Sequence, residues 1–483
     1  MSDTSKRVVV TGMGVITPLG NDIQTFWNAL CAGKDGLGQI TSCNLSDFPV
    51  QQGGEVSKIH LPTELLSRLS TDDRSQHMVV AAVKQAVEQA GLSGFEECRT
   101  GVPPVAERQA RGLSYTEEHG AGVPPVAERQ ARGLSYTEEH GAGVPPVAER
   151  QARGLSYTEE HGACVPPVAE RQARGLSYTE EYKTAVVLST NFASAGTLDG
   201  DLGLDTPWTK GNLGFGTAAD LVADIWSLSG PRATLSLSCS SGAAAIGYGA
   251  DLIRSGRADF VIAGGYDAIS RFAWAGLSLL RTMTDDKLRP FDKNRSGTLF
   301  SEGAGIVVLE SYESAKLRNS HILAELCGFG FNNNAYHMTA PSKDGQGIAE
   351  TMEMALKEAG ISPDMVDHVN THGTGTQLND STETAAIKKV LGMNAYDVPI
   401  TSIKSMIGHL MGAAGSVEAI ASILTILNGK IPPTINLTTP DPECDLPMPT
   451  AEALEADVDV VISNSSGIGG NNVSLVFRKA EKA

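Results

Sequence analysis

The chain has 483 residues, and its 38 Lys and Arg against 56 Asp and Glu give a formal net charge of −18 at pH 7. This acidic balance excludes a typical nucleic-acid-binding protein, because phosphate contacts require clustered positive charge. Hydrophobic residues make up 41% of the chain, too much for a disordered protein, and no apolar run approaches the roughly 18 residues of a membrane span. Seven scattered Cys without a secretory leader predict a soluble, cytoplasmic α/β protein rather than a disulfide framework.

The first predicted elements are a strand and turn at 6–14 and a helix at 77–92 that ends at a glycine. The stretch GMGVITPLG (12–20) is not a dinucleotide-binding loop, because Thr17 occupies the place of the third glycine. A buried strand is predicted at 185–190.

A tandem repeat of 21 residues separates that helix from that strand. GVPPVAERQARGLSYTEEHGA occupies 101–121 and recurs at 122–142 and 143–163, and a fourth copy begins at Cys164 and runs to 181. Packed repeats drift outside their buried positions, whereas these copies are nearly identical, which indicates recent duplication or an assembly error. Each unit contains few large apolar residues and a Pro-Pro breaker, so we expect 101–181 to be a surface insertion.

The rest of the chain alternates strands and helices, which predicts a layered α/β fold with mostly parallel strands. A new series of elements begins near 311–322 and predicts two halves packed together. The predicted elements are strand, turn and helix at 234–256, strands at 258–269, 303–311 and 322–331, strand and loop at 367–376, a helix at 381–392, strand, loop and helix at 399–429, and a hairpin at 460–477.

Cys239 is the first candidate for chemistry. It follows the apolar strand TLSLS and precedes a helix rich in small residues. Unpaired N–H groups at a helix N-terminus favour a thiolate, although a single Cys is more often buried and inert.

Two histidines and a lysine lie in comparable settings. His372 opens the loop HGTGT after a strand, and His409 lies in KSMIGHLMGAAGS at the start of a helix. Lys404 lies in a stretch too apolar for a solvated lysine, so it requires a buried partner, and Glu383 is the candidate. A structural role for each histidine is the alternative.

The glycine-rich segment 467–470 between two strands can present N–H groups to an oxyanion, or it can be an ordinary hairpin turn. No CxxC pair, HExxH or Walker A pattern occurs, so no metal and no nucleotide is expected. Cys, two His and Lys without a metal predict covalent thioester chemistry, with the acyl group on Cys239.

Outside the repeat, nearly the whole chain resembles the β-ketoacyl-acyl-carrier-protein synthases of the thiolase fold, in particular the elongating type II condensing enzymes. The resemblance rests on seven stretches that occur in the family's order: VVVTGMGVITPLG, SCSSGAAAIGYGADLIRSGRADFVIAGG, RPFDKNRSGTLFSEGAGIVVLE, HGTGTQLNDSTE, KSMIGHLMGAAGSVEAI, PPTINL and SNSSGIGGNN.

The resemblance implies two related βαβαβαββ halves in a five-layered α-β-α-β-α core. The N-terminal half, 1–319, would carry the nucleophile and the insertion, and the C-terminal half, 320–483, both histidines. The implied enzyme is an acyltransferase that acts in fatty-acid or polyketide biosynthesis. It needs no cofactor of its own, since its substrates are carried on the phosphopantetheine of an acyl carrier protein, and it forms a homodimer or a heterodimer with a related subunit. No nucleic-acid or membrane partner is implied.

The resemblance also implies residue roles. Cys239 takes the acyl chain, and His372 and His409 hydrogen-bond the malonyl thioester carbonyl during decarboxylation. The N–H groups of Cys239 and Ile468 form the oxyanion hole. Lys404, paired with Glu383, orients the histidines. Two further residues, Thr374 and Thr376, contact the phosphopantetheine arm.

The chain departs from the family in three places. Phe commonly stands where this chain has Ser466 and Ile468, and a smaller gate relaxes selectivity for the acyl chain or alters how the pocket closes. The sequence around the nucleophile, SLSCSSG, differs from the one usual in the family, and the repeat interrupts the first half. Carrier proteins are acidic, so a local basic patch would have to steer docking. Arg68 and Arg74 are candidates for that patch; the alternative is that both are solvated charges at the end of a helix.

Three alternatives to a condensing enzyme stay open at this point. One is a non-catalytic partner subunit of the chain-length-factor kind, although such subunits lack the nucleophilic Cys. The second is a copy inactivated by the repeat. The third is a cysteine hydrolase, which would release acid from an acyl thioester without malonyl-carrier protein.

Overall fold

The computed structural model describes residues 6–70, 73–92, 182–198 and 214–481. The repeat at 101–181 lies outside the described residues, so its expected place on the surface stays a prediction. The elements on either side are those that the sequence predicts: a helix, α3(Arg74–Gln89), and a buried strand, β4(Thr184–Ser189).

Ten strands form the central sheet system, and they fall into two groups of five with the same order. The first group has the order β1-β7-β6-β4-β5 and the second the order β8-β14-β13-β9-β10. In both groups the first two neighbouring pairs are antiparallel and the last two are parallel. With the antiparallel pair β1–β8 between the groups, antiparallel pairs outnumber parallel ones by five to four in this sheet, so the prediction of mostly parallel strands is wrong. The groups meet where β1 pairs with β8, at Val8 to Val10. The strands are β1(Val8–Ile16), β4, β5(Arg232–Leu235), β6(Phe260–Asp267), β7(Gly303–Ser311), β8(Ala324–Asn333), β9(His368–Asn370), β10(Ile400–Thr401), β13(Val460–Ser466) and β14(Asn471–Arg478).

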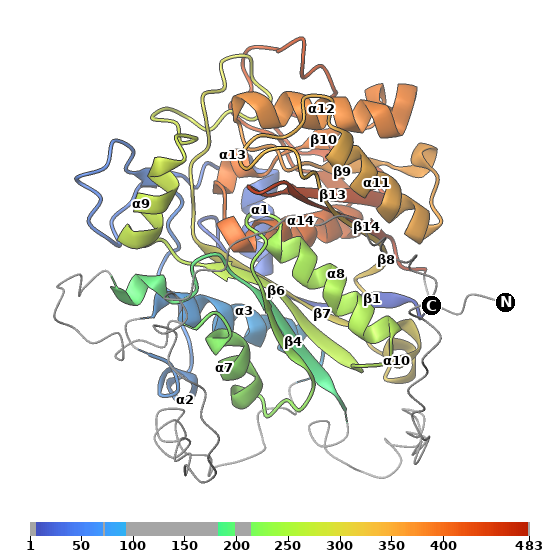
Figure 1. Cartoon of the computed structure of the whole chain (residues 1–483). Helices are drawn as coiled ribbons and strands as arrows, with labels where there is room; N and C mark the ends of the chain where they lie inside the picture. The colour runs from blue at the N-terminus through green and yellow to red at the C-terminus, as the bar shows by residue number, and fades with distance from the viewer. Residues whose placement is uncertain (1–5, 71–72, 93–181, 199–213, 482–483) are drawn as a thin grey trace, which may run out of the picture.

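Helices cover both faces of each group and give five layers (Figure 1). The helices α3 and α7(Thr217–Ile225) pack on the outer face of the first group, and α11(Gln346–Ala359) and α12(Gln377–Leu391) on the outer face of the second. Between the two groups lie α8(Ser241–Arg254) and α14(Ala414–Asn428). This α-β-α-β-α arrangement is the predicted fold, while the proposed boundary between residues 319 and 320 stays a prediction.

Smaller elements complete the described part of the chain. They are α1(Ile23–Cys31), α2(Thr63–Leu66), α9(Arg271–Leu279), α10(Tyr312–Leu317), α13(Lys404–Ile407), the 3-10 turns η4(Ala195–Leu198), η5(Pro363–Met365), η6(Gly392–Tyr396) and η7(Met411–Ala413), and the short strand pairs β2(Gly38–Gln39) with β3(Gln52–Gly53) and β11(Lys430–Ile431) with β12(Leu454–Glu455).

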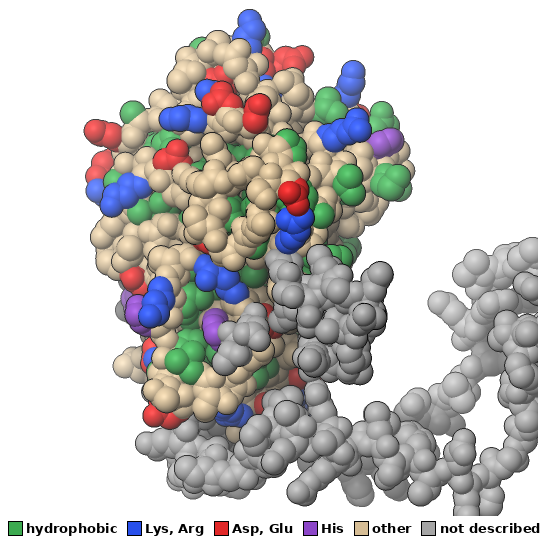
Figure 2. Space-filling model, turned by 90° about the vertical axis from the view of Figure 1, so that its left-hand side faces the viewer, with side chains coloured by type: hydrophobic (Ala, Val, Ile, Leu, Met, Phe, Trp, Pro, Cys, Tyr) green, Lys and Arg blue, Asp and Glu red, His purple; other side chains and the backbone are tan. Residues whose placement is uncertain are grey.

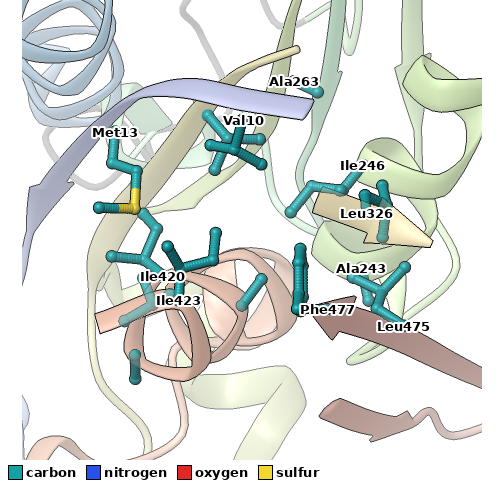
Figure 3. Close-up of a cluster of buried hydrophobic side chains, with 14 of the residues drawn as sticks. Val10, Met13, Ala243, Ile246, Ala263, Leu326, Ile420, Ile423, Leu475 and Phe477 are labelled. Atoms are coloured by element: carbon teal, nitrogen blue, oxygen red, sulfur yellow. The ribbon is translucent and has the colours of Figure 1, made fainter. Parts of the chain in front are cut away.

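The strands that line the middle layer are apolar on both faces, because helices cover both sides. Along β7, Val307 and Leu309 face the middle helices, whereas Ile306 and Val308 face α3. Figure 3 shows the middle cluster, in which side chains of both strand groups meet those of α8 and α14. Phe477 is fully buried there, so truncation to Ala would cost about 3–5 kcal/mol of folding free energy.

The helix α3 begins three residues earlier than its apolar periodicity predicts. The carboxylate of Asp73 accepts hydrogen bonds from the backbone N–H groups of Ser75 (3.1 Å) and Gln76 (3.2 Å) and caps the helix there. Polar first-turn residues do not extend an apolar pattern, which is why the pattern alone places the start too late.

The glycines of GMGVITPLG serve helix packing, in agreement with the exclusion of a dinucleotide loop. A methyl group at Gly12 would lie 2.0 Å from the carbonyl oxygen of Ala86, and one at Gly14 would lie 1.9 Å from that of Ala82. The two glycines therefore let β1 approach the backbone of α3.

Among the described residues, one helical stretch, Met411–Asn428, has the length and mean hydropathy of a membrane span. It was not anticipated from the sequence, and 89% of it is buried inside the protein, where it forms the middle layer. Its apolar composition therefore matches that of a core helix covered on all sides.

Candidate active site

Cys239 lies between the short strand β5 and the N-terminus of α8, at the edge of the middle layer. The predicted strand TLSLS ends early, at Leu235, and the chain then turns through Ser238, whose φ of +56° is uncommon for a non-glycine residue. Cys239 itself is 9% exposed. The strained turn presents the thiol at the head of the helix.

The thiol is in its neutral form at rest. Burial raises the pKa of Cys239 above its ordinary value, and the Ser238 hydroxyl, the charge of Lys404 and the N–H of Ile468 oppose that rise. The expectation that the helix N-terminus alone favours the thiolate is therefore outweighed by desolvation. These three groups would stabilise the negative charge once the proton leaves.

The small residues that follow Cys239 and His409 allow two helix N-termini to meet. A methyl group at Gly242 of α8 would lie 2.7 Å from the backbone nitrogen of Ser416, and one at Gly415 of α14 would lie 2.7 Å from that of Ala243. Only glycine permits so close an approach. The two small-residue runs, far apart in sequence, bring the nucleophile and His409 into one site.

His409 has a defined tautomer. Its Nδ1 accepts a hydrogen bond from the backbone N–H of Met411 (3.1 Å), so in the neutral ring the proton resides on Nε2. Burial and the charge of Lys404 lower the pKa of His409 well below its usual value, so the ring is neutral. Nε2 is buried without a hydrogen-bond partner among the described residues, which leaves one donor available to a substrate. The ring of Phe300, 5.4 Å away between centroids, packs against this imidazole.

His372 has the same tautomer for a different reason. The ammonium of Lys404 lies 3.4 Å from Nδ1 of His372, so this nitrogen accepts and the proton resides on Nε2. Burial, Lys404 and His409 lower the pKa of His372 well below its usual value. The two imidazole rings lie 5.5 Å apart at 85°. The site therefore holds two neutral imidazoles, each with an Nε2–H.

The partner of Lys404 differs from the one predicted. Lys404, fully buried, forms its ion pair with Glu418 of α14, not with Glu383. Glu383 instead accepts hydrogen bonds from the backbone N–H groups of His372 (2.8 Å) and Gly373 (2.9 Å) and so positions the histidine loop. Burial raises the pKa of both carboxyl groups to about 7.

Sequence reasoning missed Glu418, although a signal exists. It is the one charged residue in the helix AGSVEAIASILTILN, and a charge inside an apolar helix needs a buried partner. Glu383 is predicted from its place after the HGTGT motif, whereas the packing of α13 against α14 decides the pair, and Glu418 is also the nearer of the two in sequence.

Thr374 and Thr376 lie in the loop after β9, and their hydroxyls are 2.9 Å apart. Two buried side chains fix the backbone of this loop: Asp380 accepts from the N–H of Gly375 (3.1 Å), and Arg295 donates to the carbonyl of Thr376 (3.1 Å). The two hydroxyls therefore form a pre-arranged polar pair beside His372, and their contact with a phosphopantetheine arm stays a prediction.

The glycine-rich segment 467–470 lies over the nucleophile. A methyl group at Gly467 would come within 3.2 Å of the backbone nitrogen of Cys239, and the N–H of Ile468 points at the thiol. Gly469 and Gly470 have φ of +94° and +84°, which favours glycine. The hydroxyl of Ser466 is buried without a partner among the described residues.

The two arginines considered for carrier docking have intramolecular partners. Arg74 donates to the buried carboxylate of Glu302 (Nε–Oε1 2.8 Å), so its charge is neutralised within the fold, and it is not a candidate for docking. Arg68 donates to the backbone carbonyl of Asp224 (2.9 Å). Figure 2 shows basic and acidic side chains interspersed on one face of the molecule, so docking would depend on local charge rather than on the net charge.

Among the described residues, no group of three or more His, Cys, Asp or Glu side chains is placed to hold a metal ion. The described chemistry is that of Cys239, two imidazoles and the Lys404 ion pair, brought together from three stretches of the chain, at 239, at 372 and at 404–418.

The chain is similar to known proteins over nearly its whole length. The chain is 35% identical to the 3-oxoacyl-[acyl-carrier-protein] synthase 2 of Synechocystis sp., over 98% of both chains. Among solved structures, it is similar to the ishigamide ketosynthase/chain length factor (31% identity, TM-score 0.76, 99% of this chain and 100% of that chain). It is also similar to a ketosynthase in complex with its type II polyketide acyl-carrier protein and bound to the hexaketide (27% identity, TM-score 0.74, the same coverage).

The matched domains cover most of the chain. Residues 5–119 and 174–315 match the N-terminal domain of the β-ketoacyl synthases, and residues 323–438 match the C-terminal domain. The interruption of the N-terminal match, at 120–173, falls within the tandem repeat. The chain therefore belongs to the β-ketoacyl synthase family.

Proposed function

We propose that this chain is a β-ketoacyl-acyl-carrier-protein synthase that condenses malonyl-carrier protein with an acyl group held on Cys239. The observation that carries the proposal is the pair of neutral imidazoles, each with its proton on Nε2, beside a thiol at a helix N-terminus. A hydrolase site would need a base for water, and the tautomers of His372 and His409 make both rings donors instead.

The first step is a thioester exchange. The sulfur of Cys239 attacks the acyl thioester of the carrier, the carrier's C–S bond breaks, and the thiol proton ends on the departing phosphopantetheine sulfur. Lys404 and the N–H of Ile468 stabilise the thiolate in the transition state. Two N–H groups, those of Cys239 and Ile468, supply the oxyanion hole for the tetrahedral intermediate.

The second step is decarboxylation of the malonyl thioester. The bond to the carboxylate breaks, CO₂ leaves, and its electron pair forms an enolate whose oxygen accepts from the Nε2–H of His372 and of His409. Neutral donors serve this step because the enolate keeps its charge and therefore its nucleophilicity.

The third step is carbon–carbon bond formation. The enolate carbon attacks the acyl carbonyl on Cys239, the oxyanion collapses, and the sulfur leaves as a thiolate that takes up a proton. The product is a β-keto chain, two carbons longer, on the carrier. Thr374 and Thr376 would contact the phosphopantetheine arm, with no further cofactor.

The smaller residues at the gate are proposed to widen acyl selectivity. Ser466 and the half-buried Ile468 replace the aromatic side chains usual in the family, so bulkier or unsaturated chains would pass. This favours a specialised polyketide or polyene pathway over housekeeping fatty-acid synthesis. Ser466→Phe should narrow the range of acyl chains that load, without lowering the loading rate of a short primer.

We further propose that the chain acts in the cytoplasm with an acyl carrier protein, as a homodimer or with a related subunit. The outer strand β5 has half-exposed side chains and an unpaired edge within the described residues, which suits pairing with a second chain.

Intact-protein mass spectrometry tests the proposed function. Incubation with acyl-carrier protein should add one acyl group to the parent chain and none to Cys239→Ala, and malonyl-carrier protein should then release a β-keto product. A folded parent chain that forms no adduct with any acyl length would overturn the proposal and leave a non-catalytic partner subunit.

A further inference from the structure

A buried carboxylate beside the site has no place in the steps above. Asp267 is the last residue of β6 and is fully buried. Among the described residues it has no ion-pair partner, and its acceptor capacity is filled by hydrogen bonds from two loops. Such a group is costly to bury, so its bonds to those loops must hold them firmly.

The first loop is the turn at 190–193. The Oδ1 atom of Asp267 accepts from the hydroxyl of Thr190 (2.6 Å) and from the backbone N–H groups of Asn191 (3.1 Å) and Phe192 (3.0 Å). With its amide oriented so that both of its ends are satisfied, Asn191 donates to the carbonyl of Ser238 (3.1 Å) and accepts from the N–H of Gly412 (3.2 Å). This turn therefore holds the strained residue directly before the nucleophile.

The second loop is the turn that carries His409. The Oδ2 atom of Asp267 accepts from the N–H of Gly412 (2.6 Å), and the hydroxyl of Ser189 donates to the carbonyl of the same glycine (3.0 Å). The preceding residue, Met411, has φ of +53° and donates to Nδ1 of His409. The Gly412 peptide thus fixes the backbone that selects the Nε2–H tautomer.

The space around this contact is filled. A methyl group at Gly412 would lie 2.7 Å from Oδ2 of Asp267 and 2.9 Å from Cα of Thr190. Neither loop can move relative to the other while the carboxylate binds both.

We propose that Asp267 is a positioning residue of the condensation reaction, which ties the loop of His409 to the turn behind Cys239 through one carboxylate. The inference rests on the proposed function, since it assigns a role within the same site. Asp267 acts through Gly412 and Met411 on His409 and touches no substrate.

The chemistry of an amide makes the test directional. In Asp267→Asn the amide oxygen should stay on the side with three donors, and the NH₂ group would then face the two N–H groups that donate to Oδ2, those of Gly412 and Asn191, and repel them. We therefore expect decarboxylation, which depends on His409, to fall more than acylation of Cys239.

Decarboxylation is measured with malonyl-carrier protein in a Cys239→Ala background, which removes the acyl acceptor. Asp267→Asn should lower the turnover at least about tenfold with little change in KM, while Glu310→Gln should leave turnover per folded enzyme unchanged. Glu310 is an equally buried carboxylate on the neighbouring strand β7, held by Thr11, Ser314 and an ion pair with Arg318, so its variant controls for the loss of a buried charge away from the site.

Gly412→Ala provides a second variant that keeps the charge and disturbs the same contact. The fold-decreases in decarboxylation turnover of Gly412→Ala and Asp267→Asn should not multiply in the double variant, because both changes break the same interaction. Multiplying losses, or parental turnover in folded Asp267→Asn, would overturn the proposal.

A readout that does not need activity separates this inference from the proposed function. In ¹⁵N-histidine spectra, assigned with His409→Gln, the Nδ1 and Nε2 resonances of His409 should shift in Asp267→Asn and stay unchanged in Glu310→Gln. Unchanged His409 resonances in Asp267→Asn would overturn the inference even if the chain condenses acyl groups. If the parent chain does not decarboxylate malonyl thioesters but these resonances shift, the proposed function fails and the positioning role stands.

Discussion

Replacement of Lys404 by Met should separate decarboxylation from folding. The ammonium of Lys404 donates toward Nδ1 of His372 at 3.4 Å and keeps the ring proton on Nε2. A hydrogen bond from a charged donor contributes about 1.5–3 kcal/mol, which corresponds to about a 10- to 150-fold preference for that tautomer. Without that preference the two tautomers of His372 become comparable in energy, so Lys404→Met should slow decarboxylation of malonyl-carrier protein by about twofold through the tautomer alone.

The same ion pair predicts an order of stabilities. Glu418 already has its pKa raised to about 7, so without Lys404 it takes up a proton near neutral pH and need not remain charged. In Glu418→Gln the buried ammonium of Lys404 loses its ion-pair partner, which costs about 3–5 kcal/mol of folding free energy. Glu418→Gln should thus unfold at lower denaturant concentration than Lys404→Met.

Single-turnover release of CO₂ and chemical denaturation measure these two effects. The surface pair of Lys84 and Glu88 on α3 supplies the control, because Lys84→Met should cost no more than about 0.5 kcal/mol. A folded Lys404→Met that decarboxylates at the parental rate, or that is less stable than Glu418→Gln, would refute the reasoning about the tautomer or the pair.

Three further predictions follow from the same structure. Gly242→Ala places a methyl group 2.7 Å from the backbone nitrogen of Ser416. The melting temperature should therefore fall by several degrees, and acylation of Cys239 should slow. An unchanged melting curve and acylation rate would contradict the tight contact between α8 and α14. Burial lowers the pKa of His372 and His409, so both rings stay neutral as the pH falls through 6.5. The decarboxylation rate of Cys239→Ala should therefore not fall as the pH is lowered through 6.5. A fall there would mean that one of the two imidazoles becomes protonated. Deletion of 101–181, which the sequence predicts to be a surface insertion, should leave the melting temperature within a few degrees of the parent. A sharp fall by calorimetry would show that the repeat is part of the fold.

The sequence was sufficient to single out Cys239, His372 and His409, which the fold brings together, and to predict most of the elements. The catalytic roles of these three side chains stay a prediction. Cys239 and His409 stand at the start of runs of small residues, and His372 at the start of a glycine loop, because backbones and substrates must approach closely there. The apolar runs and their glycine ends placed the strands and helices to within a few residues, since local hydrophobic patterns follow the periodicity of each element.

Only the tertiary structure decided which groups face each other. Lys404 pairs with Glu418 and not with Glu383, and the tautomer of His409 depends on the N–H of Met411, because both follow from how α13, the 409–413 turn and α14 pack. Asp267 carried no signal in the sequence, since one buried carboxylate at a strand end has no pattern around it. Local composition determines which segments form, whereas a buried charge finds its partner through packing between segments distant in sequence, and that information is spread over the whole fold.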